Sequence, residues 1–113
     1  MPLTHPLPDP VVELIARRFR VMGEPTRIRL LEHLHDGEAT VQQLVEATGH
    51  TQQNVSKHLG VLLAAGIVGR RKQGTSVWYR ITDATALELC EQVCAILERH
   101  YAELQEALGS AAT

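Results

Sequence analysis

Residues 40–66 read TVQQLVEATGHTQQNVSKHLGVLLAAG and contain two helical patterns separated by a tight turn. The spacing Thr-x-x-Gln that begins at Thr40 is that of a capping box, and it predicts a short helix with apolar residues at helical intervals. The turn contains Gly49, and Thr51 then caps a second helix that Gly66 ends in a left-handed cap conformation. Two short helices joined in this way predict a helix-turn-helix motif.

The sequence on either side of this motif predicts more helices and a β-hairpin, because the apolar period changes from about 3.6 to 2 after Gly66. The expected elements are helices over about 9–22, 25–35, 41–48 and 51–65, strands over 67–71 and 76–81 joined by a tip at 72–75, and a last helix from a cap at Thr82 or Asp83 to about Leu108. The expected fold is mainly α with a β-hairpin wing, in the order α-α-α-α-β-β-α. One domain would span 9–108, between a mobile proline-rich arm at 1–8 and a disordered tail at 109–113.

Charge is distributed unevenly along the chain. Residues 1–46 carry a net charge of −2 and residues 83–113 carry −5, whereas residues 47–82 carry +5 without a single Asp or Glu. An acid-free basic segment that contains a helix-turn-helix indicates a surface that faces phosphate groups. The alternative is a chance cluster of cations on a solvated face.

The second helix of the motif opens with amide and hydroxyl side chains, which are the groups that read base edges in the major groove. The hairpin tip is basic and can reach the DNA backbone. The residues expected to contact double-stranded operator DNA are Thr51, Gln52, Gln53, Asn54, Ser56, Lys57 and His58 on the helix, and Arg71, Lys72 and Gln73 at the tip.

Four stretches resemble the ArsR/SmtB family of winged-helix repressors: GEPTRIRLL at 23–31, NVSKHLGVL at 54–62, AGIV at 65–68 and VWYRI at 77–81. The resemblance covers about residues 12–108. It implies a homodimer that represses its own operon until an effector loosens DNA binding, with Ser56 and His58 at the DNA surface. The alternative for His58 is a histidine that packs or hydrogen-bonds within its own subunit.

The metal sites best known in that family are not retained. The family's Cys-x-Cys pair matches Thr40 and Gln42 here, and its ligands on the last helix match Asp83, Thr85, Ile96 and Arg99. Only Asp83 among these could bind a metal ion. A transition-metal effector such as Ni²⁺ or Zn²⁺ would therefore need another site.

The thiols of Cys90 and Cys94 are the main alternative to the family's metal sites as the place where an effector acts. Apolar residues with alternating spacings of three and four form a seam along the last helix, and this spacing predicts that the helix pairs with its copy in a dimer. We expect the first helix to contribute to the same dimer interface. The seam consists of Leu87, Cys90, Cys94, Leu97, Tyr101, Leu104 and Leu108. Antiparallel pairing of this helix with its copy across a two-fold axis would place Cys90 near Cys94 of the partner subunit. The thiols then form either a soft-metal or redox sensor, or inert packing in the dimer core.

Single histidines add weaker candidates. His5 lies in the arm and could swing onto a site, and His100 lies near the end of the last helix, away from the seam. With Asp83 they complete the set of possible sensor residues.

Other classes of protein fit the sequence less well. No nucleophile–base pair, phosphate-binding loop or paired carboxylate motif is visible, so we do not expect an enzyme. The apolar runs are too short for a membrane partner, and we expect a cytoplasmic protein. The remaining hypotheses are an effector-responsive repressor, a DNA-binding regulator that has lost its effector site or answers to redox state, and a winged-helix interaction module that does not bind DNA.

Overall fold

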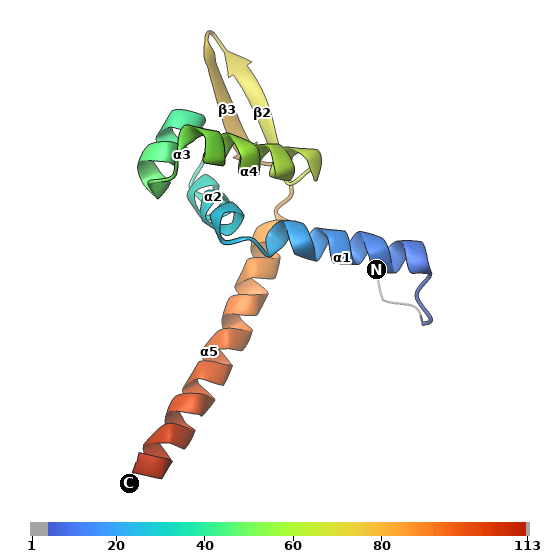
Figure 1. The fold of residues 1–113 in the computed structure, drawn as a ribbon, viewed down its shortest axis with the longest axis vertical. Helices are drawn as coiled ribbons and strands as arrows, with labels where there is room; N and C mark the ends of the chain where they lie inside the picture. The colour runs from blue at the N-terminus through green and yellow to red at the C-terminus, as the bar shows by residue number, and fades with distance from the viewer. Residues whose placement is uncertain (1–4, 113) are drawn as a thin grey trace. The chain divides into compact units, whose positions relative to one another are not determined.

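The computed structural model describes residues 5–112 of the chain. Within this range, five helices and three short strands follow one another in the predicted order, with one strand that the sequence did not indicate (Figure 1). They are α1 (Asp9–Met22), α2 (Pro25–His35), β1 (Ala39–Thr40), α3 (Val41–Thr48), α4 (Gln52–Ala64), β2 (Val68–Gln73), β3 (Ser76–Ile81) and α5 (Thr85–Ala112). The fold is a winged helix-turn-helix, as expected.

Local capping sets the ends of the helix-turn-helix. Both hydrogen bonds of the capping box are present: the Gln43 N–H donates to the Thr40 hydroxyl, and the Thr40 N–H donates to the Gln43 side chain. The Asn54 N–H donates to the Thr51 hydroxyl at the start of α4. Gly49 and Gly66 take φ angles of 76° and 74°, a left-handed conformation that other residues rarely adopt.

The core lies where α2, α3 and α4 meet the base of the sheet. Its fully buried side chains are Leu30, Leu31, Leu44, Val55, Leu59, Leu62, Ile67 and Val68. Not every leucine or isoleucine of these helices is buried: Leu63 on α4 is only half-buried, and Ile28 on α2 is exposed. The buried leucines of α4 fix which side of that helix remains outside.

The three strands form an antiparallel sheet in the order β1-β3-β2. β2 and β3 pair from Val68 opposite Ile81 to Gln73 opposite Ser76. The strand therefore runs two residues further than predicted, and Lys72 and Gln73 belong to β2 rather than to the turn. β1 adds a short third strand because Ala39 and Thr40 pair with Tyr79 and Trp78.

The chain divides into two compact units, one ending at Asp83 and the other containing α5. The helix begins at Thr85, two to three residues after the predicted cap, and continues to Ala112, past the predicted end near Leu108. Met1–Thr4 of the predicted arm and Thr113 of the predicted tail lie outside the described residues, and the mobility of the arm stays a prediction. Within residues 5–112, no helix combines the length and the apolar character that a membrane span needs.

Candidate DNA-binding interface

The outward side of α4 carries the polar residues that the sequence assigned to DNA. Thr51, Gln52, Gln53, Ser56 and Lys57 are exposed, and Asn54 is half-buried. The buried side of the same helix holds Val55, Leu59 and Leu62. A helix anchored in this way presents its first two turns to a partner without having to move.

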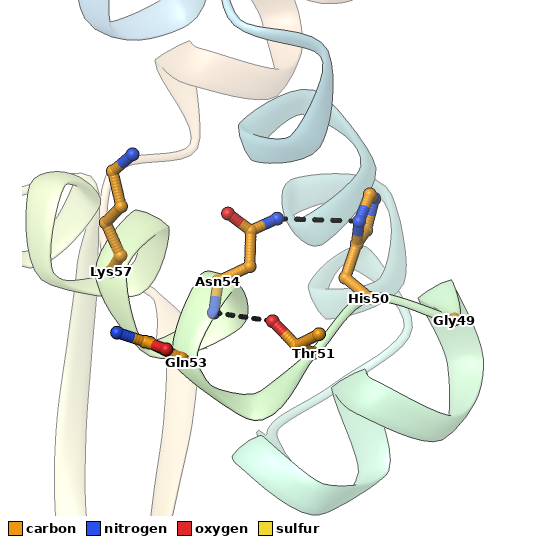
Figure 2. A pocket seen from close by; sticks show the side chains of 6 residues that line it. All are labelled: Gly49, His50, Thr51, Gln53, Asn54 and Lys57. Carbon is orange, nitrogen blue, oxygen red and sulfur yellow. Dashed lines mark hydrogen bonds between the residues drawn. The ribbon is translucent and has the colours of Figure 1, made fainter.

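An open groove lies beside the first turn of α4, lined by Gly49, His50, Thr51, Gln53, Asn54 and Lys57. Figure 2 shows the Asn54 side chain pointing toward His50, whose Nδ1 lies 3.5 Å from the Asn54 amide nitrogen. The amide nitrogen is the donor in this long contact, so Nδ1 accepts. The contact orients Asn54 within the groove. His50 was not among the predicted DNA-contacting residues, although it directly precedes the Thr51 cap.

The wing presents its cations on two different faces. Directly paired residues of an antiparallel sheet point to the same face, and neighbours along a strand point to opposite faces. Lys72 therefore shares a face with Arg70, whereas Arg71 and Gln73 share the other face with Trp78. Arg71, Lys72 and Gln73 are all exposed, but Lys72 lies on the opposite face of the sheet from the other two.

Arg71 already has a carboxylate partner. Its Nε donates to Glu38 Oε2 at 2.9 Å and its Nη2 donates to Glu38 Oε1 at 2.5 Å, while Nη1 donates to the Gln73 side chain at 2.6 Å. The guanidinium carbon also lies 5.8 Å from the centre of the Trp78 ring. The hydrogen bond from Arg71 lowers the pKa of Glu38. The charge count along the sequence missed this acid because Glu38 lies outside the acid-free segment.

His58 contradicts the expectation that it contacts DNA. The residue is 6% exposed, because position 58 faces inward with Val55, Leu59 and Leu62 on the buried side of α4. Its Nδ1 lies 3.1 Å from Arg27 Nη1, which matches the alternative of a locally bonded histidine.

Arg27 links His58 to the end of α1. Its Nε donates to the Val21 carbonyl at 2.7 Å and its Nη2 donates to the Arg20 carbonyl at 3.1 Å. A cation at this position satisfies carbonyls that the end of a helix leaves open. Arg27 thus ties the last turn of α1 to the recognition helix, a role that the sequence did not reveal.

Glu24 completes this partly buried cluster at the start of α2. Its side chain accepts the Arg27 N–H at 3.0 Å, and Oε2 lies 3.6 Å from His58 Nδ1. Partial desolvation raises the pKa of Glu24, but the Arg27 N–H and the charges of His58 and Arg27 outweigh it, so the pKa is lowered. Burial lowers the pKa of His58, and the nearby cations Arg27 and Lys57 add to this effect against the attraction of Glu24.

The sensor candidates lie outside this interface. Cys90 is half-buried and Cys94 is exposed, one turn apart on α5, and burial raises the pKa of the Cys90 thiol. His5 and His100 are exposed, and Asp83 is half-buried just before α5. No three His, Cys, Asp or Glu side chains gather around a possible metal position in residues 5–112.

Comparisons with known proteins place these features in a family. A family profile described as a helix-turn-helix domain matches residues 22–71. The chain is 37% identical over 84 residues to the HTH-type transcriptional regulator KmtR of Mycobacterium tuberculosis. It is also 36% identical over 89 residues to a probable mercury resistance operon repressor of Streptomyces lividans. These alignments cover 74% and 79% of this chain, and they span 65% and 66% of the two relatives.

Solved structures agree with the sequence relatives. The uncharacterized HTH-type transcriptional regulator Rv0081 of M. tuberculosis is 34% identical over 92 residues, which cover 80% of this chain and 81% of that protein. Its crystal structure matches with a TM-score of 0.77 at 32% identity, over 85% of this chain and 97% of the other. The solution structure of Mb0332 from Mycobacterium bovis matches with a TM-score of 0.73 at 25% identity, over 88% and 95% of the two chains. That protein is described as a homodimeric winged helix-turn-helix DNA-binding domain and a possible ArsR-family regulator.

Proposed function

The chain belongs to the ArsR/SmtB family of winged helix-turn-helix transcriptional regulators, and from this premise we propose that it is a repressor that binds an inverted-repeat operator as a homodimer. One observation carries the proposal: the exposed first turns of α4 hold amides, hydroxyls and Lys57, while the opposite side of the helix is fixed in the core. Such a helix can enter a major groove and offer Gln52 and Gln53 to base edges. Lys57 and Lys72 supply phosphate contacts.

The dimer is proposed from exposed apolar side chains on α1 and α5. Leu14 and Phe19 on α1 are 62% and 58% exposed, and Leu97 and Tyr101 on α5 are 60% and 62% exposed. Large apolar groups in such numbers on two helices favour burial against a second copy. A two-fold axis would set the two α4 helices about 34 Å apart, one turn of B-DNA.

The test of this function is salt-dependent binding. We expect the protein to bind DNA from the promoter of its own operon more tightly than an unrelated duplex, with log K falling linearly against log salt. Lys72→Ala should reduce the magnitude of that slope by about 0.9 per subunit. Arg29→Ala removes an exposed cation of α2 that pairs with Glu32, and it should leave the slope unchanged. A protein that binds neither duplex would be an interaction module instead of a DNA-binding regulator.

We further propose that an effector acts at Cys90 and Cys94 to release the operator. The relative named as a mercury resistance operon repressor supports a metal ion, and thiolates suit soft or borderline ions such as Zn²⁺. One subunit offers two sulfur donors here, whereas structural zinc takes four ligands. The two thiols therefore fit a metal ion only if a second subunit contributes its own pair, as antiparallel pairing of α5 would allow.

A thiol-based redox response is the second candidate, since Cys94 is exposed on the helix. One experiment distinguishes the metal response from the redox response. Zn²⁺, Ni²⁺ and a mild oxidant are added separately to the purified protein, and the change in DNA affinity is measured for each. The double variant Cys90→Ser/Cys94→Ser should lose the response of the parent. If it keeps every response, the thiols are structural and the sensor lies among His5, Asp83 and His100. If the parent itself shows no response, neither these metal ions nor the oxidant is its effector, and the proposed role of the thiols is wrong.

A further inference from the structure

One face of the wing sheet carries an ion pair that spans its three strands. Arg71 lies on β2, Trp78 lies opposite it on the central strand β3, and Glu38 directly precedes β1 on the far side. The Arg71 side chain therefore reaches across the face of Trp78 to the Glu38 carboxylate. We name this arrangement the wing clasp.

The wing clasp uses the three nitrogens of the guanidinium group. Two of them bind the two oxygens of Glu38 side by side, which is the geometry that an arginine uses for a carboxylate or a phosphate. The third nitrogen donates to the Gln73 side chain at 2.6 Å, and the guanidinium group lies over the Trp78 ring in a cation–π contact. A DNA phosphate would have to displace Glu38 to obtain the same two hydrogen bonds.

Charge leads to the same conclusion. Arg71 and Glu38 have side chains that are 41% and 34% exposed, so the pair lies at the surface and remains sensitive to a nearby phosphate. Glu38 neutralises Arg71 and would itself repel a DNA backbone brought close to this face. Lys72 points to the opposite face of the sheet and is free of this effect.

We propose that Glu38 holds Arg71 away from DNA phosphates and so lowers the affinity of the wing for the DNA backbone. This inference rests on the proposed DNA-binding function. Phosphate contacts carry no sequence information, so a wing with one cation less on the backbone binds every duplex more weakly and with a smaller salt slope. Arg71, predicted from the sequence as a phosphate contact, serves instead as the other half of the clasp.

The experiment is a four-protein cycle of wild type, Glu38→Gln, Arg71→Ala and the double variant. The probe is a fluorescein-labelled 30-bp duplex of random sequence, and affinity is measured by anisotropy between about 50 and 200 mM KCl. We expect Glu38→Gln to increase the magnitude of the salt slope by about 0.9 per subunit, because the released Arg71 reaches a phosphate. Across that fourfold range of salt, the added slope corresponds to about 3.5-fold in affinity per subunit.

The other variants show whether the change in slope comes from Arg71. Arg71→Ala alone should leave the salt slope unchanged. In the double variant, Arg71→Ala should remove the increase in slope that Glu38→Gln causes. Glu32→Gln removes an exposed acid from the Arg29 pair on α2 and should not alter the slope. Thermal unfolding of each variant checks that the domain remains folded.

Two results would overturn the proposal in different ways. If Arg71→Ala weakens the slope and Glu38→Gln does not change it, Arg71 is an ordinary phosphate contact and only the clasp is refuted. If the wild type does not bind duplex DNA in a salt-dependent way, both the clasp and the proposed function fail.

Discussion

His58 faces from α4 toward the start of α2, and its contact with Arg27 indicates which protonation state the folded protein holds. An arginine can only donate, so the contact between Arg27 Nη1 and His58 Nδ1 requires that Nδ1 carry no proton. Folding therefore favours the neutral imidazole, in agreement with the pKa of His58 below its ordinary value of 6.5. The resemblance to the ArsR/SmtB family implied that this ring lies at the DNA surface, but its position on α4 beside Val55, Leu59 and Leu62 directs it inward.

The stability of the fold should accordingly depend on pH through His58. The unfolded imidazole takes up a proton near pH 6.5, whereas the folded one takes it up at a lower pH. The stability that His58 contributes is therefore present above pH 6.5, and it is lost as the pH falls from there through the lowered pKa. We expect urea unfolding to show this decline between about pH 7 and pH 5 in the wild type, and a shallower decline in His58→Gln.

The matched control is His35→Gln, which makes the same chemical change at an exposed position. It should keep the pH dependence of the wild type. An identical decline in His58→Gln and wild type would show that the ring does not couple folding to protons.

Among the elements, α3 depends on its capping box. Replacing Thr40 by Ala removes the hydroxyl that accepts the Gln43 N–H, and we expect a loss of about 1 kcal/mol in the free energy of unfolding. Thr40→Ser keeps the hydroxyl and should lie close to the wild type. Thr75→Ala at the exposed hairpin turn controls for a general effect of losing a threonine, and it should change the free energy by less than about 0.5 kcal/mol. Chemical denaturation measures all three, and equal stability of Thr40→Ala and Thr40→Ser would contradict the role of the cap.

The recognition helix leads to a prediction about sequence preference. Gln53→Ala should relax selectivity at one base position in each half-site by about 1–3 kcal/mol, while the salt slope stays the same. Selection from a random duplex pool, followed by competition binding, measures this. Gln92→Ala on α5 is the control, since that glutamine is not among the residues assigned to DNA. Equal weakening of every sequence by Gln53→Ala would mean that Gln53 contacts the backbone.

The features that the sequence predicted depend on residues close together in the chain, whereas the features that it missed depend on residues far apart in the chain. Thr40 and Thr51 begin helices and Gly66 ends one, each through neighbours a few residues away, so their roles follow from local patterns. β1 has two residues, too few to show an alternation. The pairs Arg27–His58 and Glu38–Arg71 join residues 31 and 33 positions apart, and no periodicity marks such contacts before the chain has folded.

For the whole molecule, the prediction concerns assembly. The seam on α5 remains exposed at Leu97 and Leu104, with 60% and 54% of each residue accessible. A glutamate at either position would have to lose its hydration in a helix pairing, so Leu97→Glu should convert the dimer to a monomer and abolish binding to an inverted repeat. Sedimentation at micromolar concentration measures the mass. Ala102→Glu, on another side of the same helix, should remain a dimer, and a monomeric wild type would refute the arrangement.

The short strand β1 has a consequence for engineering. Thr40 pairs with Trp78 in the sheet and also caps α3, so the wing and the helix-turn-helix share a residue. A chimera that transplants residues 49–65 alone would place a foreign recognition helix on a frame built for another one. A transplant of residues 38–82 carries the frame, the Glu38–Arg71 pair and the reading helix together. The segment 38–82 is therefore the unit to exchange between related proteins, and a protein that receives it should acquire the operator preference of this chain.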